Sequence, residues 1–428
     1  MTALEEEIVS FDNLLEAFNE VARGKRYKRE FQEFYQNLEE NLISIQNELI
    51  WRTYQPEPTV TFPIREPKLR LITRPHIKDR VVHHALIRVV QPYFERVFHD
   101  SSFSCRPGAE YIEAKVFHKG SDRPTPLIYS RNTHARLTYP KNVPYYAAKE
   151  YVRKEVSEAY PDAERIEIHL HEGKGQLAAC RNYSKILRSA FGRYGGSFVV
   201  ISIDIRKCFQ SIDHDVTKTL INWLMSSDRS RNILEAFIEG MFHGDEFVCW
   251  LFGLIIDAVA EGLPIGFLPS QHEANLNGTV IDYLAEVVMG CRGRYVRYMD
   301  DVRIICRNRD EAKEILAVID EFCCNVMRLQ LSDKKTTIKT FHKFDTFCGY
   351  KVFPHHLEPK EATMKRSHKR LEKKLRQFET GIITAEQLRS SALSLTAYLS
   401  HTNTTEDALA QSCLSVAHGA CSQARQNA

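Results

Sequence analysis

Two apolar runs stand out in the pattern of hydrophobic and polar positions along this chain. Residues 197–204 form an apolar run of buried-strand length that ends in Asp204. Residues 295–305 predict two β-branched strands joined by a bend that carries Asp300 and Asp301. The order of strands and helical stretches around these runs predicts an α+β fold.

Helical periodicity marks both ends of the chain. Ser10 caps an amphipathic stretch that ends near Gly24, and residues 31–51 predict a second helix. Residues 384–399 predict a further helix, which opens with the spacing of a capping box. We expect the residues after about 417 to fray.

The acidic residues of the bend are the first candidate for chemistry. Adjacent carboxylates repel each other, and Mg²⁺ prefers one or two carboxylates together with phosphate oxygens of a substrate. As alternatives, Asp is a favoured turn residue and a common helix N-cap. Asp204, at the end of a distant strand, favours the metal site, because phosphoryl transfer with two metals needs carboxylates on both sides of the ion pair.

Six further blocks occur in a fixed order around these aspartates. They are residues 64–72, 79–86, 102–108, 262–271, 331–336 and 347–354. In this order the chain resembles a bacterial reverse transcriptase of the group II intron-like lineage, over most of residues 10–400. The resemblance implies a right-hand polymerase architecture with fingers, an antiparallel palm sheet with helices, and a helical thumb.

The resemblance also implies a division of the chain. Residues 1–108 would form the N-terminal helices and fingers, 109–172 an insertion within the fingers, 173–355 the palm, and 356–428 the helical thumb and tail. Remaining fingers elements would lie at the start of the palm segment.

The insertion departs from the pattern of related enzymes, which lack this segment. Residues 149–159 predict a helix and residues 164–170 alternate like a strand, so we expect a small folded insert. Long segments within a domain are usually functional or disordered. We favour a contact with RNA or with another subunit, and a surface excursion without function stays open.

The resemblance assigns the metal ligands residue by residue. Asp204 and Asp300 would bind two Mg²⁺ ions, which Mn²⁺ would be able to replace, with the backbone carbonyl of Ile205 as a further ligand. Asp301 would complete the acidic site with a smaller direct role.

Nucleotide-binding roles follow in the same way. Arg70, together with Lys68, would neutralise the triphosphate, since Arg binds phosphate in a bidentate manner. Phe209 matches the aromatic residue that clashes with a ribose 2′-hydroxyl and so selects deoxynucleotides. The alternative for Phe209 is a core side chain of a palm helix.

Other blocks supply contacts to the template and the primer. Gln271 would touch the nucleotide or template, and Lys334 or Lys335 would lie near the pyrophosphate unless both are surface lysines. Gly349 and Tyr350 would position the primer end.

Charge is clustered along the chain. The formal net charge is only +3, so a phosphate-binding surface must come from local grouping. One predicted helix that begins near Glu361 carries such a group, and its basic residues include Lys365, Arg366, Lys369, Arg370 and Lys373. A solvated basic face is the alternative, but at the position of the thumb we expect contact with an RNA–DNA duplex.

The remaining composition is that of an ordinary globular protein, with 43% apolar and 26% charged residues. The eleven cysteines form no Cys-x-x-Cys pair, so the sequence supports neither a zinc ribbon nor a thioredoxin-like motif. No apolar run approaches membrane-span length and the acidic N-terminus is unlike a signal peptide, so we expect a cytoplasmic protein without a membrane partner.

We therefore expect an RNA-directed DNA polymerase that copies a dedicated, structured noncoding RNA with deoxynucleoside triphosphates. Ser270 and Gln271 make the chain most similar to diversity-generating retroelement enzymes and to "unknown group" defence-associated reverse transcriptases. The insertion and the amino-acid sequence of residues 267–271 favour anti-phage defence over diversification. The insertion is also compatible with a homo-oligomer or with a complex between this chain and a second protein subunit.

Two other classes of function stay open. The first is a template-independent or protein-primed DNA polymerase, for which Tyr139, Tyr145 and Tyr146 of the insertion would be available as priming hydroxyls. The second is a non-catalytic RNA-binding scaffold, against which the three clustered aspartates argue. An RNA-dependent RNA polymerase is disfavoured by Phe209.

Overall fold

The chain folds into two compact units. The computed structural model describes residues 1–65, 69–106, 111–119, 125–130, 137–138, 145–171, 174–226, 233–234, 242–400, 402 and 407–426. Unit 1 comprises Met1–Cys105 and Val199–Thr340, and unit 2 comprises Arg106–Phe198 and Phe341–Ala428. Each unit combines helices with mainly antiparallel sheets.

Unit 1 begins with a helical layer. Its helices are α1 (Ala3–Val9), α2 (Phe11–Ala22), α3 (Arg29–Gln36), α4 (Leu38–Ile50) and α5 (Ile77–Val97). Ser10 caps α2 as predicted, since its side chain accepts a hydrogen bond from the Asn13 amide at 3.2 Å. The single helix predicted for residues 31–51 is wrong: Asn37 leaves the helical conformation, with φ −121°, and separates α3 from α4.

A β-hairpin and further helices complete this unit. The hairpin pairs β1 (Val60–Ile64) with β2 (Arg70–Arg74). The later helices are α8 (Cys208–Ser211), α9 (His214–Met225), α11 (Glu246–Ile256), α12 (Leu268–Tyr283), the π-helix η1 (Leu284–Val288) and α13 (Arg309–Asn325).

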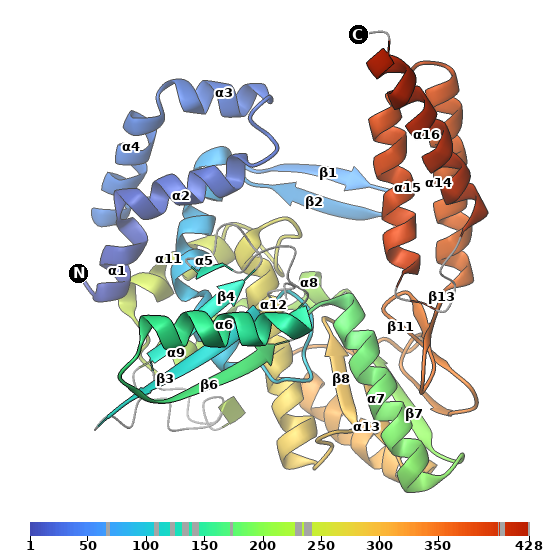
Figure 1. Cartoon of the computed structure of the whole chain (residues 1–428). Helices are drawn as coiled ribbons and strands as arrows, with labels where there is room; N and C mark the ends of the chain where they lie inside the picture. The colour runs from blue at the N-terminus through green and yellow to red at the C-terminus, as the bar shows by residue number, and fades with distance from the viewer. Residues whose placement is uncertain are drawn as a thin grey trace. The chain divides into compact units, whose positions relative to one another are not determined.

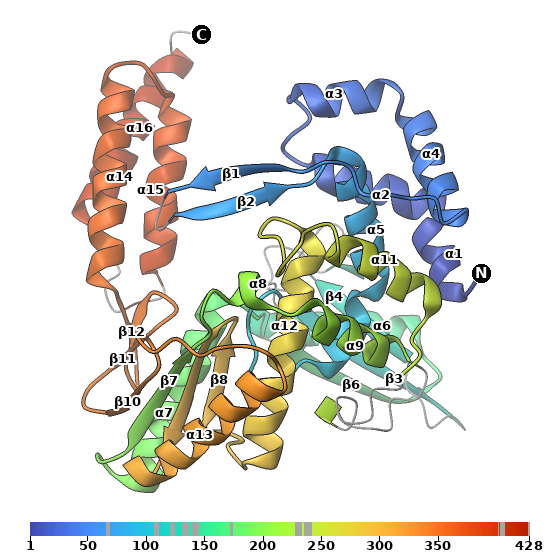
Figure 2. The same cartoon turned by 180° about the vertical axis from the view of Figure 1, so that it is seen from behind.

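Four antiparallel strands form the sheet of unit 1, in the order β10-β7-β9-β8. Their bounds are Val199–Asp204 for β7, Tyr295–Tyr298 for β8, Asp301–Cys306 for β9 and Thr337–Thr340 for β10. The strand predicted for residues 197–204 and the hairpin predicted for 295–305 are thereby confirmed. Helix α13 packs against β7, β9 and β10 (Figure 2).

Helix α12 is buried on all sides although much of it is polar. It packs against α5, α9 and α11, and its residues from His272 to Asp282 are all buried. Most of the polar groups are paired, but both carboxylate oxygens of Glu273 are buried without a hydrogen-bond partner among the described residues. Because burial disfavours the charged form, it raises the pKa of Glu273 to about 8.

Unit 2 contains the insertion as a small α+β layer. The sheet has the order β5-β4-β3-β6, and its strands are β3 (Tyr111–His118), β4 (Thr125–Ser130), β5 (Leu137–Thr138) and β6 (Ala163–His171). Helix α6 (Tyr145–Ala159) packs on β3 and β6 (Figure 1), where Val152 and Val156 meet Ile112, Ala114 and Ile168 in a core. The helix and the strand predicted for the insertion are confirmed.

The rest of unit 2 consists of a long helix, a three-stranded sheet and a helical bundle. These elements are α7 (Gln176–Tyr194), β11 (Asp345–Phe347), β12 (Tyr350–Val352), β13 (Leu357–Pro359), α14 (Glu361–Glu379), α15 (Ala385–Leu399) and α16 (Ala408–Gln426). Helices α14 to α16 run side by side (Figures 1 and 2). Thr384 and Gln387 form the predicted capping box of α15.

The end of the chain differs from the prediction. Local sequence predicts fraying after about residue 417, but α16 continues to Gln426. Its apolar positions Ala410, Cys413 and Ala417 repeat every three to four residues and are buried in the bundle core. Packing against α14 and α15 therefore extends the helix beyond the point that local sequence suggests.

No helix in the described part of the chain is both long enough and apolar enough to cross a bilayer.

The buried carboxyl of Glu273 gives the stability a specific dependence on pH. The raised pKa means that Glu273 is protonated in the folded protein and ionised in the unfolded chain between about pH 5 and 8, so its contribution to stability is lost as the pH rises. Glu273→Gln stays neutral, and its stability relative to the wild type should increase by ~1.4 kcal/mol per pH unit over that range.

Denaturant unfolding at several pH values measures this difference. The exposed Glu261, changed to Gln, is the matched control and should follow the wild type. A Glu273→Gln variant whose relative stability does not change with pH would contradict the prediction.

Candidate active site

Three aspartates meet at one end of the sheet of unit 1. Asp204 is the last residue of β7 and Asp301 the first residue of β9, and the two face each other in the antiparallel register. Asp300 lies next to them in the two-residue turn between β8 and β9. Opposite residues in such a pair share a face of the sheet, with Cβ atoms ~5 Å apart. Like charges at such positions destabilise the pair unless a cation offsets them.

The protonation of the turn reflects this crowding. Burial raises the pKa of Asp300, and the negative charge of Asp204 raises it further. Burial also raises the pKa of Asp301, against the opposing effect of Arg303. In both groups burial disfavours the ionised form, and the neighbouring carboxylates add to the effect. The neighbouring Cys208 thiol is neutral, because burial and the Asp300 charge raise its pKa to about 12.

Two side-chain cations contact the aspartates. The Lys335 Nζ atom lies 2.6 Å from both carboxylate oxygens of Asp204. The Arg303 guanidinium donates a hydrogen bond to the Asp301 carboxylate. Arg303 lies two residues after Asp301 on the same strand, and side chains at i and i+2 share a face. The spacing of Asp301 and Arg303 is visible in the sequence and indicates this contact.

A turn after β9 and α13 delivers Lys335 to the site. The Ser332 amide donates to the Asp204 carbonyl at 2.8 Å, and the amides of Lys335 and Thr336 donate to the Ser332 carbonyl at 3.0 and 2.8 Å. Lys334 is exposed. Of the two lysines considered from the sequence, the structure brings Lys335 to the aspartates.

The carbonyl of Ile205 points to the acidic side of β7. The Arg206 amide donates to the Gln330 carbonyl at 2.8 Å, on the side of β7 that faces residues 330–332. Because the C=O and N–H of a trans peptide point in opposite directions, the Ile205 carbonyl is directed to the other side, where β9 carries Asp301.

These oxygen donors suit a hard divalent cation. Mg²⁺ is usually held by one or two carboxylates with water and substrate phosphates, without a complete protein cage. No group of three His, Cys, Asp or Glu side chains within the described residues is arranged to hold a metal ion. Asp204, Asp300 and the Ile205 carbonyl are the groups that would hold a divalent cation.

A glycine-containing loop connects the aspartates to the hairpin. The Leu263 amide donates to the Phe209 carbonyl, and the Thr73 amide of β2 donates to the Ile265 carbonyl at 2.8 Å. Gly262 has φ +67°, and a Cβ atom there would lie 2.6 Å from backbone atoms of Phe209 and Gln210. Only glycine allows this close approach.

Three of the predicted nucleotide-binding residues lie around this loop. Phe209 is half-buried in α8, five residues beyond Asp204. Arg70 is exposed at the start of β2, and its charge lies close enough to Asp300 to lower that pKa against the larger effect of burial. Gln271 is exposed in the first turns of α12. Lys68 lies outside the described residues.

The predicted primer-binding residues belong to unit 2. Gly349, with φ +84°, precedes Tyr350 between β11 and β12. Tyr398 of α15 holds both residues, because its hydroxyl donates to the Gly349 carbonyl at 3.0 Å and its ring stacks on Tyr350 at 4.8 Å. Their role toward a primer stays a prediction.

Helix α14 carries the predicted duplex-binding residues on its exposed face. Leu371 is buried against α15 and α16, so the helix has one apolar and one basic side. The five predicted residues lie along this helix and are all exposed: Lys365, Arg366, Lys369, Arg370 and Lys373.

Comparison with known proteins assigns the central part of the chain. Residues 169–361 match the family model described as reverse transcriptase (RNA-dependent DNA polymerase). No curated protein sequence matches the chain significantly. The chain therefore contains a reverse transcriptase domain, the domain of a nucleotidyltransferase, and the aspartates lie within it.

Solved structures with some likeness include three of yeast telomerase. Apo telomerase from Candida tropicalis without its C-terminal domain is 12% identical with a TM-score of 0.41, and the match covers 73% of this chain and 59% of that one. The apo enzyme without this truncation is 13% identical with a TM-score of 0.41, and the match covers 74% of this chain and 52% of that one. Telomerase from Candida albicans, in complex with a fragment of telomeric RNA, is 10% identical with a TM-score of 0.38. That match covers 85% of this chain and 62% of the telomerase chain.

The chain thus spans between about half and three fifths of these telomerase chains. TM-scores of this size carry no functional conclusion. The family match, together with the mixture of helices and antiparallel sheets, confirms the predicted α+β polymerase fold.

The contact between Lys335 and Asp204 predicts competition between the ammonium group and a metal. In metal-free protein, Lys335→Met should lower the unfolding temperature, because the repulsion between Asp204 and Asp300 loses its nearest cation. Saturating Mg²⁺ should then raise the unfolding temperature more in the variant than in the wild type.

Thermal unfolding with and without Mg²⁺ measures both effects. Lys334→Met is the matched control, since this neighbour is exposed, and it should behave as the wild type. Equal stabilisation of all three proteins by Mg²⁺ would refute the competition.

Proposed function

We propose that this protein is an RNA-directed DNA polymerase that makes cDNA from a dedicated noncoding RNA by two-metal nucleotidyl transfer. The observation that carries the proposal is the pairing of Asp204 with Asp301 across β7 and β9, with Asp300 in the adjoining turn. These residues lie inside the stretch that matches the reverse transcriptase family.

The aspartates are proposed to hold the catalytic metals. Asp204 and Asp300, with the Ile205 carbonyl, are the ligands of two Mg²⁺ ions, and Asp301 supports them through its bond to Arg303. Bound ions of this kind lower the pKa of an attacking hydroxyl and neutralise the charge of the leaving pyrophosphate. Lys335 holds the Asp204 carboxylate before the metals bind and becomes available for phosphate when they do.

The residues around the 262–267 loop are proposed to bind the incoming deoxynucleotide. The positive charge of the exposed Arg70 acts on Asp300, and its guanidinium is proposed to bind the triphosphate of a nucleotide at the metal site. The Phe209 carbonyl accepts a hydrogen bond from the Leu263 amide of the loop, and its ring is proposed to exclude a ribose 2′-hydroxyl. Gln271 is proposed to touch the nucleotide or the template, and Lys68 and Lys334 to add positive charge.

The basic face of α14 is proposed to follow the backbone of the RNA–DNA duplex. Lys and Arg residues along one helix, opposite an apolar face that packs in the bundle, match the requirement for phosphate contacts without base recognition. Gly349 and Tyr350 are proposed to hold the primer end.

For the biological setting we propose anti-phage defence with a structured noncoding RNA as template. The insertion of residues 109–172, which contains folded elements, and the sequence Ser270–Gln271 favour this role over that of a diversity-generating retroelement. A neighbouring noncoding RNA without a repeat pair would support defence, and a template repeat with a variable repeat would support diversification. Sequencing the nucleic acid that co-purifies with the protein identifies the template.

The polymerase assignment predicts the effect of removing the turn carboxylates. Asp300→Ala with Asp301→Ala should abolish incorporation of deoxynucleotides on a primed RNA template, to below ~0.1% of the wild-type rate, because the metals lose ligands. Asp310→Ala is the control, since this residue is 89% exposed in the first turn of α13.

A primer-extension assay with both variants gives the result. Unchanged incorporation by the Asp300/Asp301 variant would defeat the assignment. Synthesis without an RNA template, or DNA that remains covalently bound to the protein, would favour the template-independent or protein-primed alternative. RNA binding without any metal-dependent synthesis would favour a scaffold.

The role of α14 predicts a change in salt dependence. Replacing Lys369, Arg370 and Lys373 by Ala should weaken duplex binding and reduce the slope of log K against log salt concentration by up to ~0.9 for each phosphate that the variant no longer neutralises. Replacing Lys313 of α13, which is 65% exposed, should leave the slope unchanged. Fluorescence anisotropy at several salt concentrations measures the slope, and an unaltered slope in the triple variant would contradict the duplex contact.

A further inference from the structure

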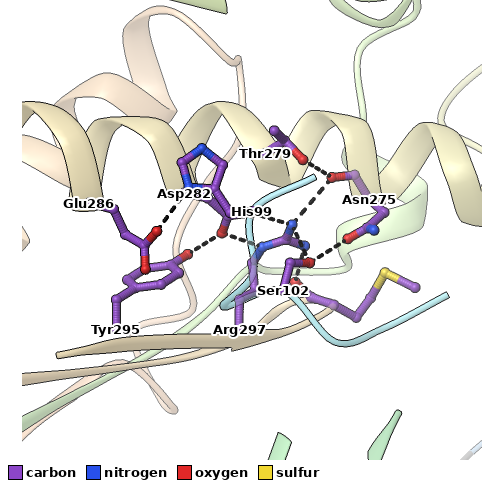
Figure 3. Close-up of polar contacts among 9 residues, drawn as sticks. His99, Ser102, Asn275, Thr279, Asp282, Glu286, Tyr295 and Arg297 are labelled. Atoms are coloured by element: carbon purple, nitrogen blue, oxygen red, sulfur yellow. Dashed lines mark hydrogen bonds and ion pairs between the residues drawn. The ribbon is translucent and has the colours of Figure 1, made fainter. Parts of the chain in front are cut away.

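A fully buried arginine lies directly behind the catalytic turn. Arg297 of β8 is 0% exposed, although Arg is almost never buried unless it is paired. Its partner is Asp282 of α12, also 0% exposed: Nε lies 2.6 Å from Oδ1, and Nη2 lies 2.7 Å from Oδ2. Figure 3 shows this pair between α12 and the strand. The paired geometry fixes the plane of the guanidinium group.

Neighbouring groups fix the pair from several sides. The Arg297 Nη2 atom also donates to Ser102 Oγ at 2.9 Å and to the Asn275 carbonyl at 3.3 Å. The Tyr295 hydroxyl donates to Asp282 Oδ1 at 2.6 Å (Figure 3). The residues around Ser102 also hold the backbone of β8, since the Arg297 amide donates to the Ser101 carbonyl at 2.9 Å.

One donor of Arg297 is directed at the turn itself. The Nη1 atom donates to the carbonyl of Met299 at 3.2 Å. Met299 has φ +57°, whereas Asp300 does not have a positive φ, which is the combination found in type II′ turns. A side chain in this conformation costs ~1–3 kcal/mol and persists only when the surroundings hold it. The bond from Arg297 is such a restraint, immediately before the metal-binding Asp300.

Helix α12 is adapted to the guanidinium group. Gly278 lies in the middle of α12, where glycine is unfavourable by about 1 kcal/mol relative to alanine. A Cβ atom there would overlap Arg297, with the Nη2 atom at 3.0 Å and two other guanidinium atoms closer. The sequence thus accepts a weaker helix at the position where the arginine needs space.

We propose that Arg297, held by Asp282, is a positioning residue that fixes the Met299–Asp300 turn so that the Asp300 carboxylate is placed for metal binding. This inference rests on the proposed polymerase function, which it deepens. Arg297 has no exposed surface, and it acts on the reaction only through the backbone of the turn.

The alternative is that the buried pair only stabilises the fold. Replacing a buried ion pair by apolar residues of similar volume is often neutral or stabilising, whereas removing one partner leaves a buried charge. The test variant therefore replaces the group as a whole: Arg297→Met, Asp282→Leu and Tyr295→Phe. It removes the donor to Met299 and leaves no charge unpaired between these three residues.

Two further variants separate the effects. Tyr295→Phe alone removes a hydrogen bond to Asp282 but retains the bond from Arg297 to Met299, so it is the matched control. Arg297→Lys keeps a positive charge for Asp282 and loses the planar fork, and it replaces the triple variant if that variant does not fold.

Two measurements are made on each folded variant. The first is the rate of nucleotide addition as a function of Mg²⁺ concentration, with the affinity for primer–template measured in parallel. We expect the triple variant, or Arg297→Lys in its place, to lose ~10–100-fold in kcat, to need several-fold more Mg²⁺ for half-maximal rate, and to bind primer–template as the wild type does. The second is Mn²⁺ binding to the free protein by electron paramagnetic resonance, which should weaken several-fold.

The outcomes are distinct for the two proposals. A loss of rate by the same factor at every Mg²⁺ concentration, with unchanged Mn²⁺ affinity, shows a role in folding alone and overturns the inference. A triple variant with the kcat and the Mn²⁺ affinity of the wild type also overturns the inference. If the wild-type protein adds no nucleotide, the proposed function is wrong. The positioning role is then tested by comparing the Mn²⁺ affinity of the triple variant with that of the wild type.

Discussion

The mutual repulsion of Asp204, Asp300 and Asp301 is the constraint on which the rest of unit 1 depends. The antiparallel register of β7 and β9 places two of these carboxylates opposite each other, and the turn adds the third. Burial raises the pKa of both turn aspartates, and the charge of Asp204 raises it further. Lys335 and Arg303 supply part of the positive charge that offsets the repulsion. A pair of divalent ions would supply the remainder, and this requirement connects the fold to phosphoryl transfer.

The surrounding elements hold this unfavourable arrangement in place. Helix α12 carries buried polar groups on several faces: Asp282 fixes Arg297, and Glu273 remains protonated without a hydrogen-bond partner among the described residues. Buried polar groups lower the stability of such a helix, and among them Asp282 is explained by its contact with Arg297. The Gly262 loop on another side joins Phe209 to the hairpin strand β2. Rigid elements thus support a turn that itself contains a strained residue.

Much of this architecture could be predicted from local sequence. The β-branched runs at 197–204 and 295–305 and the capping box at Thr384 each contain their own signal, and they form the expected strands and helix. The break at Asn37 is not predicted, because the apolar periodicity continues across it. The length of α16 is not predicted either, because packing in the bundle determines it.

The site itself depends on information that single segments do not contain. The aspartates can be identified from their types and their order, but their register across β7 and β9 is set by the whole sheet. Lys335 is brought to Asp204 by a turn whose geometry two adjacent lysines do not reveal. The pairing of Arg297 with Asp282 joins a strand to a helix, and no local pattern marks it.

Anomalous diffraction from crystals grown with Mn²⁺, a primed RNA template and a non-reactive deoxynucleotide tests the central claim most directly. The account predicts two anomalous peaks ~3.5–4 Å apart between the carboxylates of Asp204 and Asp300, with the Lys335 ammonium displaced from Asp204. A map without peaks at this position, in which Lys335 still contacts both oxygens of Asp204 while the nucleotide is bound, would contradict it.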